Sequence, residues 1–318
     1  MKPTTTVQSG SISLAVYTWG VKTPGRPTVL LVHGYPDSAS IWEDTAKILA
    51  ADHFVIAYDV RGAGRSDAPK RIADFDMSYL VDDMRAVLDA VSPDEAVHLI
   101  GHDWGGIQGW EAATSEKLKG RLLSYTTASG PCLDHIGHWA RARMKNLNPQ
   151  NARMLARQAL HSWYVYLFHL PLLAPTAWKK GLDRQWPKVL TLLEGISGHH
   201  NPTQRGDGAV GVNLYRANVF KRVLNPQIRR ADIPVQLIVA KRDAFITESL
   251  FEDLPQWAPR LWRRDVDAGH WIQASRPEWV AKCVREFVQL VEKGIEAPDL
   301  NCIQDLRGPG AGSQAKAA

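Results

Sequence analysis

The sequence is poor in cysteine and has no long apolar run. Its three cysteines, Cys132, Cys283 and Cys302, are odd in number and far apart, which favours free thiols in a reducing compartment. No segment reaches the roughly 18 consecutive apolar residues of a membrane span, and no apolar core follows the first residues as it does in a signal peptide. We therefore expect a cytoplasmic protein without a membrane span.

The chain also lacks blocks of charge of one sign. Its net charge is +5, but its 38 Lys and Arg residues are scattered in short clusters, which usually form solvated faces. We therefore expect no nucleic-acid partner. With 45% hydrophobic and 22% charged residues, the 318-residue composition is that of a globular protein, long enough for one large domain with an insertion.

Signatures of metals and nucleotides are missing as well. Cys132, His135 and His138 are spaced like part of a metal site, but no fourth ligand is evident. The glycines of residues 59–66 precede no Lys-Ser or Lys-Thr pair, and those of residues 308–312 follow no predicted strand. The sequence therefore predicts neither a metal nor an organic cofactor.

Short apolar runs alternate with helical patterns along most of the chain. Such runs are typical of parallel strands buried on both faces, and residues 11–18 indicate an additional, half-buried strand at the start. Helical spacing covers residues 41–51, 79–91 and 277–293. The predicted fold class is α/β, with a mostly parallel central sheet; the buried runs are residues 28–32, 54–58, 96–100, 122–128, 234–240 and 261–266.

Residues 131–231 interrupt this pattern. They contain no convincing strand, carry Trp, Leu and Arg at helical spacing and are broken by several prolines. We interpret them as an all-helical cap over the ends of the strands, where α/β sheets bind ligands. The core then comprises residues 1–130 and 232–295, and residues 296–318, rich in Gly, Ala and Pro, are expected to be disordered.

A tight turn follows the run at residues 96–100. The sequence Gly101-His102-Asp103-Trp104-Gly105-Gly106 has the strand, small-x-x-x-small, helix pattern of a nucleophile elbow, which presents its third residue above the sheet. That residue is Asp103 rather than Ser or Cys. A carboxylate can displace at a strained or activated sp³ carbon and form an alkyl ester that water then cleaves. This chemistry opens epoxides or expels halide.

Two more polar residues follow predicted strands. Asp243 comes after the run at 234–240 and His270 after the run at 261–266, which gives the chain order nucleophile, acid, histidine of α/β-hydrolases. Since the carboxyl ends of parallel strands meet at one edge of a sheet, we expect Asp103, Asp243 and His270 to form a triad. The backbone N–H groups of Tyr35 and Trp104 are the candidate oxyanion hole.

These motifs together carry a family resemblance. Residues 33–36 (His-Gly-Tyr-Pro), 59–66, 101–106 and 269–271 (Gly-His-Trp) resemble the α/β-hydrolase-fold epoxide hydrolases over residues 10–293. The resemblance implies two acid-donating cap tyrosines, matched by Tyr164 and Tyr215, although Tyr166 competes for the first role. Residues 129–135 and 214–218 are also similar to the hydrolase half of bacterial proteins fused to a short-chain dehydrogenase, whose second half this chain lacks.

The implied reaction converts a hydrophobic epoxide and water to a vicinal diol, a chemistry associated with detoxification. Asp103 attacks an epoxide carbon while Tyr164 and Tyr215 protonate the departing oxygen. His270, oriented by Asp243, then activates the water that cleaves the ester. The identity of the epoxide, the stereochemistry and the oligomeric state, with a homodimer among the options, remain open at this stage.

Three alternatives remain. Haloalkane dehalogenases use the same Asp nucleophile and often a Trp after it, like Trp104, but their common halide donor is an Asn where this chain has Tyr35. Fluoroacetate-type dehalogenases place arginines where residues 105–108 read Gly-Gly-Ile-Gln. A binding protein that had lost catalysis on this fold would lack a triad member, whereas all three are present.

Overall fold

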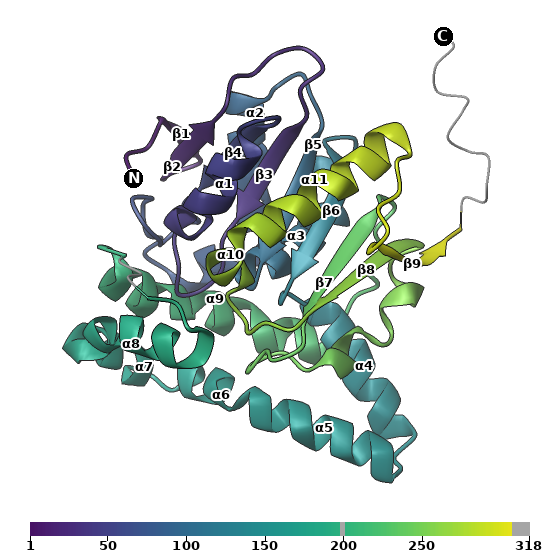
Figure 1. Ribbon diagram of the computed structural model, residues 1–318. Helices are drawn as coiled ribbons and strands as arrows, with labels where there is room; N and C mark the ends of the chain where they lie inside the picture. Colours follow the sequence, from purple (N-terminus) through teal and green to yellow (C-terminus); the bar gives the residue numbers. More distant parts are fainter. Residues whose placement is uncertain (198–200, 307–318) are drawn as a thin grey trace.

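The computed structural model describes residues 1–197 and 201–306, and in these residues nine strands form one sheet (Figure 1). β3 to β8 are parallel, whereas β1, β2 and β9 pair antiparallel at the two edges. The order across the sheet is β1 (Thr5–Ser9), β2 (Ile12–Trp19), β4 (Phe54–Tyr58), β3 (Thr28–Val32), β5 (Val97–His102), β6 (Leu122–Ala128), β7 (Val235–Ala240), β8 (Arg260–Val266) and β9 (Asn301–Asp305).

Both faces of this sheet are buried. Along β3, Leu30 and Val32 belong to one apolar core, and Val29 and Leu31 belong to a second core on the other face. Because successive side chains of a strand point to opposite faces, an all-apolar strand supplies both cores at once. This explains the uninterrupted apolar runs of the sequence and confirms the predicted mostly parallel α/β fold.

Helices cover each face. α1 (Glu43–Leu49) and α11 (Pro277–Lys293) lie side by side on one face, whereas α2 (Met77–Val91) and α3 (Trp104–Ala113) lie together on the other (Figure 1). In α2 the buried apolar residues recur at positions 77, 80, 81, 84, 87 and 88, the spacing of one helical face. Shorter helices complete the core: η1 (Ala39–Trp42), η2 (Ile72–Phe75), η3 (Glu116–Leu118), η5 (Glu248–Phe251), η6 (Leu254–Gln256) and α10 (Ile272–Ser275).

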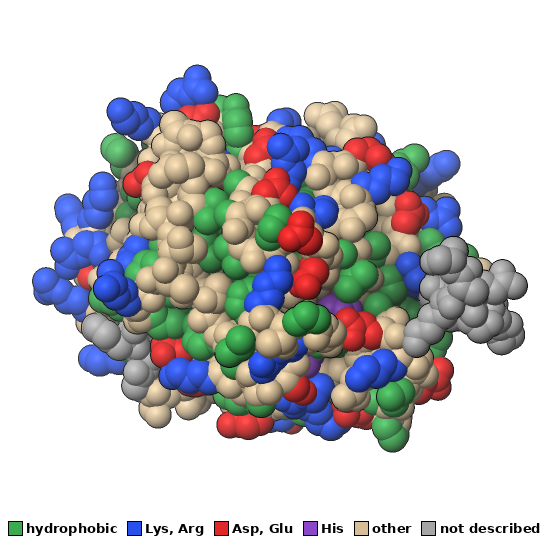
Figure 2. All heavy atoms as spheres, turned by 90° about the horizontal axis from the view of Figure 1, so that it is seen from above, with side chains coloured by type: hydrophobic (Ala, Val, Ile, Leu, Met, Phe, Trp, Pro, Cys, Tyr) green, Lys and Arg blue, Asp and Glu red, His purple; other side chains and the backbone are tan. Residues whose placement is uncertain are grey.

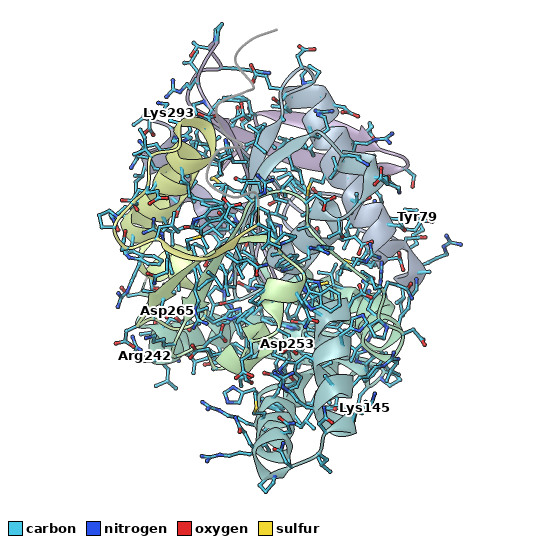
Figure 3. All side chains as sticks on the ribbon, turned by 90° about the vertical axis from the view of Figure 1, so that its right-hand side faces the viewer. Tyr79, Lys145, Arg242, Asp253, Asp265 and Lys293 are labelled. Atoms are coloured by element: carbon cyan, nitrogen blue, oxygen red, sulfur yellow. The ribbon has the colours of Figure 1, made fainter. Side chains whose placement is uncertain are left out.

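A helical cap lies across one end of the sheet, at the carboxyl ends of the parallel strands (Figure 1). Figure 3 shows Lys145, the last residue of α4, at the cap end of the molecule and Lys293 at the opposite end. The helices are α4 (Leu133–Lys145), α5 (Pro149–His161), α6 (Trp163–His169), α7 (Leu173–Ala177), the π-helical η4 (Trp178–Leu182), α8 (Asp183–Glu194) and α9 (Gln204–Leu224). The expected cap limits, residues 131 and 231, fall in the connections outside α4 and α9.

The structure corrects the expectations for both ends of the chain. Residues 301–305 are not disordered but form β9, which pairs with β8, because the backbone of this short polar segment completes the open edge of the sheet. Residues 307–318, with the 308–312 glycine stretch, lie outside the described residues. At the amino end, β1 covers β2, so most of β2 is fully buried rather than half-buried.

Two further observations bear on the environment of the protein. Cys132 and Cys283 are buried, Cys302 is exposed, and all three are unpaired. Across residues 1–197 and 201–306, none of the helices has the length and apolar character needed to cross a bilayer.

Candidate active site

Asp103 stands at the turn between β5 and α3. Its backbone has φ of 51° and ψ of −121°, a left-handed conformation that a non-glycine residue adopts only under constraint. The constraint comes from close packing, because a side chain at position 105 would collide with the backbone carbonyl of Val32. The turn therefore holds the Asp103 carboxyl at the edge of the sheet, as the elbow pattern predicts.

His270 lies between two carboxylates. Its Nδ1 is 2.9 Å from Oδ2 of Asp243, and its Nε2 is 3.6 Å from Oδ2 of Asp103. The backbone N–H groups of Phe245 and Ile246 donate to the other oxygen of Asp243, at 2.8 and 3.0 Å. Asp243 is thus fixed and can orient the imidazole toward Asp103. The structure brings together the three residues that the sequence predicts as a triad.

The candidate oxyanion hole faces Asp103. The backbone N–H of Tyr35 donates to Oδ1 of Asp103 at 2.7 Å. Trp104 is the first residue of α3, where backbone N–H groups have no acceptor within the helix. The Tyr35 hydroxyl bonds to the Gly208 carbonyl of α9 at 2.9 Å and accepts from Trp178 Nε1 at 2.7 Å. The side chain of Tyr35 therefore ties its loop to the cap.

Two cap tyrosines meet beside Asp103. The ring centroids of Tyr164, on α6, and Tyr215, on α9, are 6.0 Å apart, and both residues line the same cavities as Asp103. Burial and the Asp103 carboxylate raise the pKa of both hydroxyls well above the ordinary value, so both keep their protons. Tyr166 lines the smaller of these cavities as well, but its side chain is 57% exposed, and its ring packs beside Phe220 rather than beside Tyr215.

Electrostatics favour a charged His270 in this arrangement. Burial alone lowers the pKa of its imidazole, but the carboxylates of Asp243 and Asp103 raise the pKa to about 10. Burial likewise raises the pKa of Asp243, but the charge and hydrogen bond of His270 more than offset this, so the pKa lies below its usual value. His270 is accordingly an imidazolium at neutral pH.

Two cavities meet at Asp103, Tyr164 and Tyr215. The first, of about 230 Å³, extends between α4, α5 and α9 and is lined by apolar residues such as Ile136 and Leu250. The second, of about 410 Å³, extends under α7 and α8 and reaches His270 and Trp271. A ligand with two apolar arms can therefore occupy both cavities while its centre contacts Asp103.

The sequence analysis missed an acidic residue of the cap, Glu194. Its Oε1 accepts a hydrogen bond from the backbone N–H of His270 at 2.7 Å. Gly269 permits this approach, since a side chain there would collide with the Glu194 carboxyl group. Glu194 ends α8, where the helix dipole disfavours a negative charge. An acidic residue at the carboxyl end of a predicted helix is the one signal in the sequence that indicates a role for Glu194 outside the helix.

Three core residues near His270 were missed too. Trp271 Nε1 donates to Asp37 at 2.9 Å, and burial raises the pKa of Asp37 to about 7. The ring of His102 bonds through Nε2 to the His270 carbonyl at 2.8 Å and through Nδ1 to Gln273 at 2.9 Å. Asp37 follows the motif at residues 33–36 and His102 lies within the motif at residues 101–106, so proximity along the sequence could have indicated them; Gln273 carried no signal.

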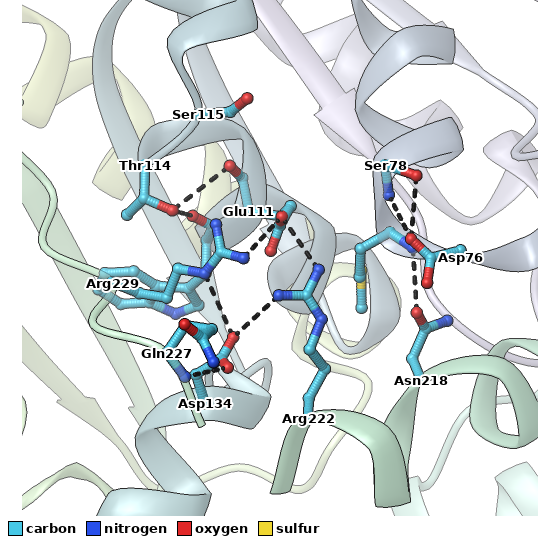
Figure 4. A network of polar contacts seen from close by, with 12 residues as sticks. Asp76, Ser78, Glu111, Thr114, Ser115, Asp134, Asn218, Arg222, Gln227 and Arg229 are labelled. Carbon is cyan, nitrogen blue, oxygen red and sulfur yellow. Dashed lines mark hydrogen bonds and ion pairs between the residues drawn. The ribbon is translucent and has the colours of Figure 1, made fainter. Parts of the chain in front are cut away.

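Charged residues join the cap to the core at the points where the chain enters and leaves it (Figure 4). Glu111 of α3 accepts from Arg222 at 3.1 Å and from Arg229 at 3.0 Å. The same two guanidinium groups approach Asp134 of α4, at 3.5 and 3.3 Å. All four side chains are largely buried, so each charge depends on the others for compensation.

The remaining sequence motifs are structural. The turn at residues 59–66 wraps around the Asp59 carboxylate, which accepts from the backbone N–H groups of Ala39 and Arg65, both at 2.8 Å. His135 bonds to the Arg229 carbonyl and stacks on Trp257. Among the residues that the structure describes, no group of three or more His, Cys, Asp or Glu side chains is placed to hold a metal.

Comparisons with known proteins identify the family of the chain. Residues 27–277 match the family model described as alpha/beta hydrolase fold. The chain is 34% identical over 288 residues to a Mycobacterium tuberculosis protein named probable oxidoreductase EphD. That match covers 88% of this chain but 48% of the relative, so the chain spans about half of the relative's length. It is also 26% identical over 283 residues to epoxide hydrolase 3 of Xenopus tropicalis, covering 83% of this chain and 72% of that protein.

Solved structures share the fold. An epoxide hydrolase from Bacillus megaterium, in complex with the product (R)-3-[1]naphthyloxy-propane-1,2-diol, is similar with a TM-score of 0.74. The match has 18% identity and covers 90% of this chain and all of that one. An epoxide hydrolase from Vigna radiata is similar with a TM-score of 0.70 at 20% identity, covering 90% and 97% of the two chains. At these identities the likeness concerns the fold.

Proposed function

This chain belongs to the α/β-hydrolase fold family, and from that premise we propose that it hydrolyses hydrophobic epoxides to vicinal diols through an ester on Asp103. One observation carries the proposal. The Asp103 carboxyl group faces His270 on one side and borders the cavities of Tyr164 and Tyr215 on the other. A nucleophile, a base and two acids thus surround one reaction centre. The names of the epoxide hydrolase relatives support this reading, and the unpaired cysteines support a cytoplasmic location.

In the first step an oxygen of Asp103 attacks an epoxide carbon, and the bond between that carbon and the ring oxygen breaks. The ring oxygen takes a proton from Tyr164 or Tyr215, which avoids a free alkoxide as leaving group. Acids positioned in this way contribute on the order of 10² to 10⁴ in rate. The product is a hydroxyalkyl ester of Asp103 and a tyrosinate.

Ester formation also changes the state of His270. It removes the negative charge of Asp103, one of the two carboxylates that raise the pKa of the imidazole. The pKa of His270 therefore falls, and its proton can pass to the tyrosinate, which restores the tyrosine. His270 becomes a neutral base only after the nucleophile has reacted. Ester formation therefore precedes the activation of water.

In the second step His270 takes a proton from water while the hydroxide adds to the ester carbonyl carbon. The negative charge on the carbonyl oxygen is stabilised by the N–H groups of Tyr35 and Trp104. The alcohol leaves with the proton from His270, and the carboxylic acid at Asp103 then returns its own proton to His270. The diol departs, and the resting pair of Asp103 and His270 is restored.

The test is the substitution Asp103→Ala, assayed for diol formation over a panel of epoxides. Activity should fall below detection, whereas Glu116→Gln, which changes an exposed carboxylate that lines neither cavity, should leave it unchanged. Diol formation by the folded Asp103→Ala variant at a rate near that of the wild type would overturn the proposal.

The two cavities suggest the shape of the substrate. A terminal epoxide would fill one cavity, whereas an epoxide with an apolar arm on each carbon would fill both. We therefore expect a higher kcat/KM for 1,2-disubstituted epoxides than for terminal epoxides of equal carbon number.

One observation favours a second candidate, haloalkane dehalogenation. The indole N–H of Trp104 is buried and has no acceptor among the described residues, as a halide-binding donor would be. Against this, Tyr35 stands where those enzymes commonly carry Asn, and two tyrosines would have no role in releasing halide. Release of bromide from alkyl bromides by the wild-type chain, without diol formation from epoxides, would favour dehalogenation.

A further inference from the structure

The outer surface of the cap is unusually apolar. Four side chains, Trp163, Leu167, Leu173 and Leu193, line the larger cavity and are also exposed, so they form the rim of its opening. Trp163, for example, is 59% exposed. Leu172 and Leu192, neighbours of two rim residues, are 76% and 86% exposed. Contiguous apolar surface of this kind on a soluble domain indicates a binding surface rather than scattered exposed residues.

Leu172 is constrained as well as exposed. Its φ is 66°, in the left-handed region, at the start of α7. This backbone conformation is sterically unfavourable for leucine but not for glycine, and burial of the side chain does not compensate for the strain. Backbone strain at an exposed apolar residue indicates that the side chain contacts another molecule, which is absent from the isolated chain.

The cap segment that carries these side chains is also basic. No Asp or Glu occurs between Lys145 and Asp183. Over residues 146–194, six exposed cations make no ion pair within the described residues, whereas the two acidic residues are engaged: Asp183 is paired with Arg205 at 3.0 Å, and Glu194 binds the His270 backbone. These cations are Arg153, Arg157, Lys179, Lys180, Arg184 and Lys188. On the face opposite the cap, by contrast, acidic and basic side chains are intermingled (Figure 2).

We infer that the cap docks on the surface of an anionic phospholipid bilayer, with the rim of the larger cavity facing the lipid. Exposed Leu and Trp side chains enter the interface, and unpaired Lys and Arg bind the lipid phosphates, the usual combination in peripheral membrane binding. The cavity then opens into the lipid, where apolar epoxides concentrate. Docking follows from the surface alone, and the delivery of substrate rests on the proposed function.

A bilayer fits this surface better than a second copy of the chain. In a two-fold symmetric dimer the same surface would face itself, and its unpaired cations would repel one another without acidic partners. An anionic bilayer supplies the missing negative charge together with an apolar phase. A dimer through the cap is therefore an outcome of the test rather than the proposal.

The test is flotation of the full chain with vesicles, which requires no turnover. The chain should float with vesicles of phosphatidylglycerol and phosphatidylcholine, much less with phosphatidylcholine alone, and less in high salt. Arg153→Glu with Arg157→Glu should lower the partition coefficient by at least about fivefold per residue. The matched control, Lys119→Glu with Lys293→Glu, reverses two exposed charges of the core away from the cap and should bind like the wild type.

A second variant removes the apolar contact without threatening the fold. Leu172→Gly deletes the exposed side chain at a backbone conformation that glycine favours, so the protein should fold normally and lose about tenfold in vesicle binding. Val21→Ser, at the opposite end of the molecule, controls for loss of an exposed apolar residue. Equal flotation with both vesicle types, or variants that bind like the wild type, would overturn the inference.

Two further measurements separate the remaining outcomes. Light scattering reports the oligomeric state. A dimer that Leu172→Gly abolishes, together with no vesicle binding by the wild type, would assign the surface to a second copy and overturn the inference.

Hydrolysis of a small water-soluble epoxide by Leu172→Gly should match the wild type. Absence of that activity in the wild type would contradict the proposed function but leave the vesicle result standing.

Discussion

Nε2 of His270 lies 3.6 Å from Oδ2 of Asp103, and the opposite ring nitrogen bonds to Asp243. The distance is short enough for an ion pair, and it places the imidazole where a water molecule attacking an ester of Asp103 would be activated. In the proposed mechanism the Asp103 carboxylate helps to keep His270 protonated, so His270 would become available as a base only after the carboxylate has reacted.

This coupling predicts different pH dependences for the two steps. Asp103 and Asp243 raise the pKa of His270 to about 10 in the free enzyme, so ester formation should vary little between about pH 7 and 9. Ester hydrolysis should rise with pH over this range and level off below pH 10, since His270 has lost the influence of the Asp103 charge. Rapid-quench single-turnover kinetics separate the two steps; a hydrolysis step that falls with increasing pH would contradict the coupling.

The same pKa has a consequence for stability. A histidine whose pKa is raised by folding stabilises the folded state below its unfolded pKa of about 6.5, and this contribution disappears as the pH rises to about 10. The free energy of unfolding should therefore decline over this interval more steeply in the wild type than in Asp243→Asn, which removes the larger of the two raising charges. Urea titrations at several pH values test this; equal slopes would contradict it.

The cap tyrosines should act as acids in the first step. Tyr164→Phe or Tyr215→Phe should each lower the rate of ester formation by about 10², and the double variant by more, because the ring oxygen would leave unprotonated. Tyr166→Phe is the matched control: Tyr166 lines the smaller cavity, but its side chain is mostly exposed beside Phe220, so the variant should react like the wild type. A large loss in Tyr166→Phe with none in Tyr164→Phe would reassign the first acid.

Glu194 should act as a positioning residue for His270. Glu194→Ala leaves the His270 backbone N–H without its 2.7 Å acceptor, so ester hydrolysis should slow by about tenfold while KM changes little. Glu194→Gln retains an acceptor oxygen and should restore most of the rate. Gln185→Ala, on the exposed side of the same helix, serves as the control. If Glu194→Gln and Glu194→Ala lose activity equally, the carboxylate charge matters rather than the hydrogen bond.

The charged cluster that joins cap and core should contribute to stability. Glu111→Gln removes the carboxylate shared by Arg222 and Arg229 and leaves two largely buried guanidinium groups undercompensated. The free energy of unfolding should fall by about 2 to 4 kcal/mol. Glu116→Gln, which breaks an exposed ion pair with Lys119, should cost less than about 1 kcal/mol. Urea denaturation compares the two, and equal losses would argue against a structural role for the cluster.

The parts of the fold that the sequence predicts are those dictated by local pattern. Buried parallel strands are short and wholly apolar, so β3 and β4 were found at their observed limits. The elbow required a small-residue pattern, because position 105 packs against the backbone of β3. β9 was not predicted. This edge strand is held by backbone hydrogen bonds to β8, and such pairing does not require a characteristic side-chain pattern.

The same reasoning explains what was predicted of the site. Asp103, Asp243 and His270 follow strands, whose ends converge in any parallel sheet, so their meeting could be expected without coordinates. No comparable rule predicts which residues of the cap meet, because the packing of its helices depends on contacts between residues far apart in sequence. The choice of Tyr164 over Tyr166 and the contact of Glu194 with His270 depend on how α6 and α8 lie over the core.

The central claim is a covalent ester on Asp103, and intact-mass spectrometry of His270→Gln mixed with an epoxide tests it most directly. Without its base the variant should accumulate an adduct with the mass of the whole epoxide, located by peptide mapping at Asp103. The same variant carrying Asp103→Asn should show no such adduct, which separates the ester from alkylation of the exposed Cys302. A folded His270→Gln variant that forms no adduct with epoxides hydrolysed by the wild type would contradict the mechanism.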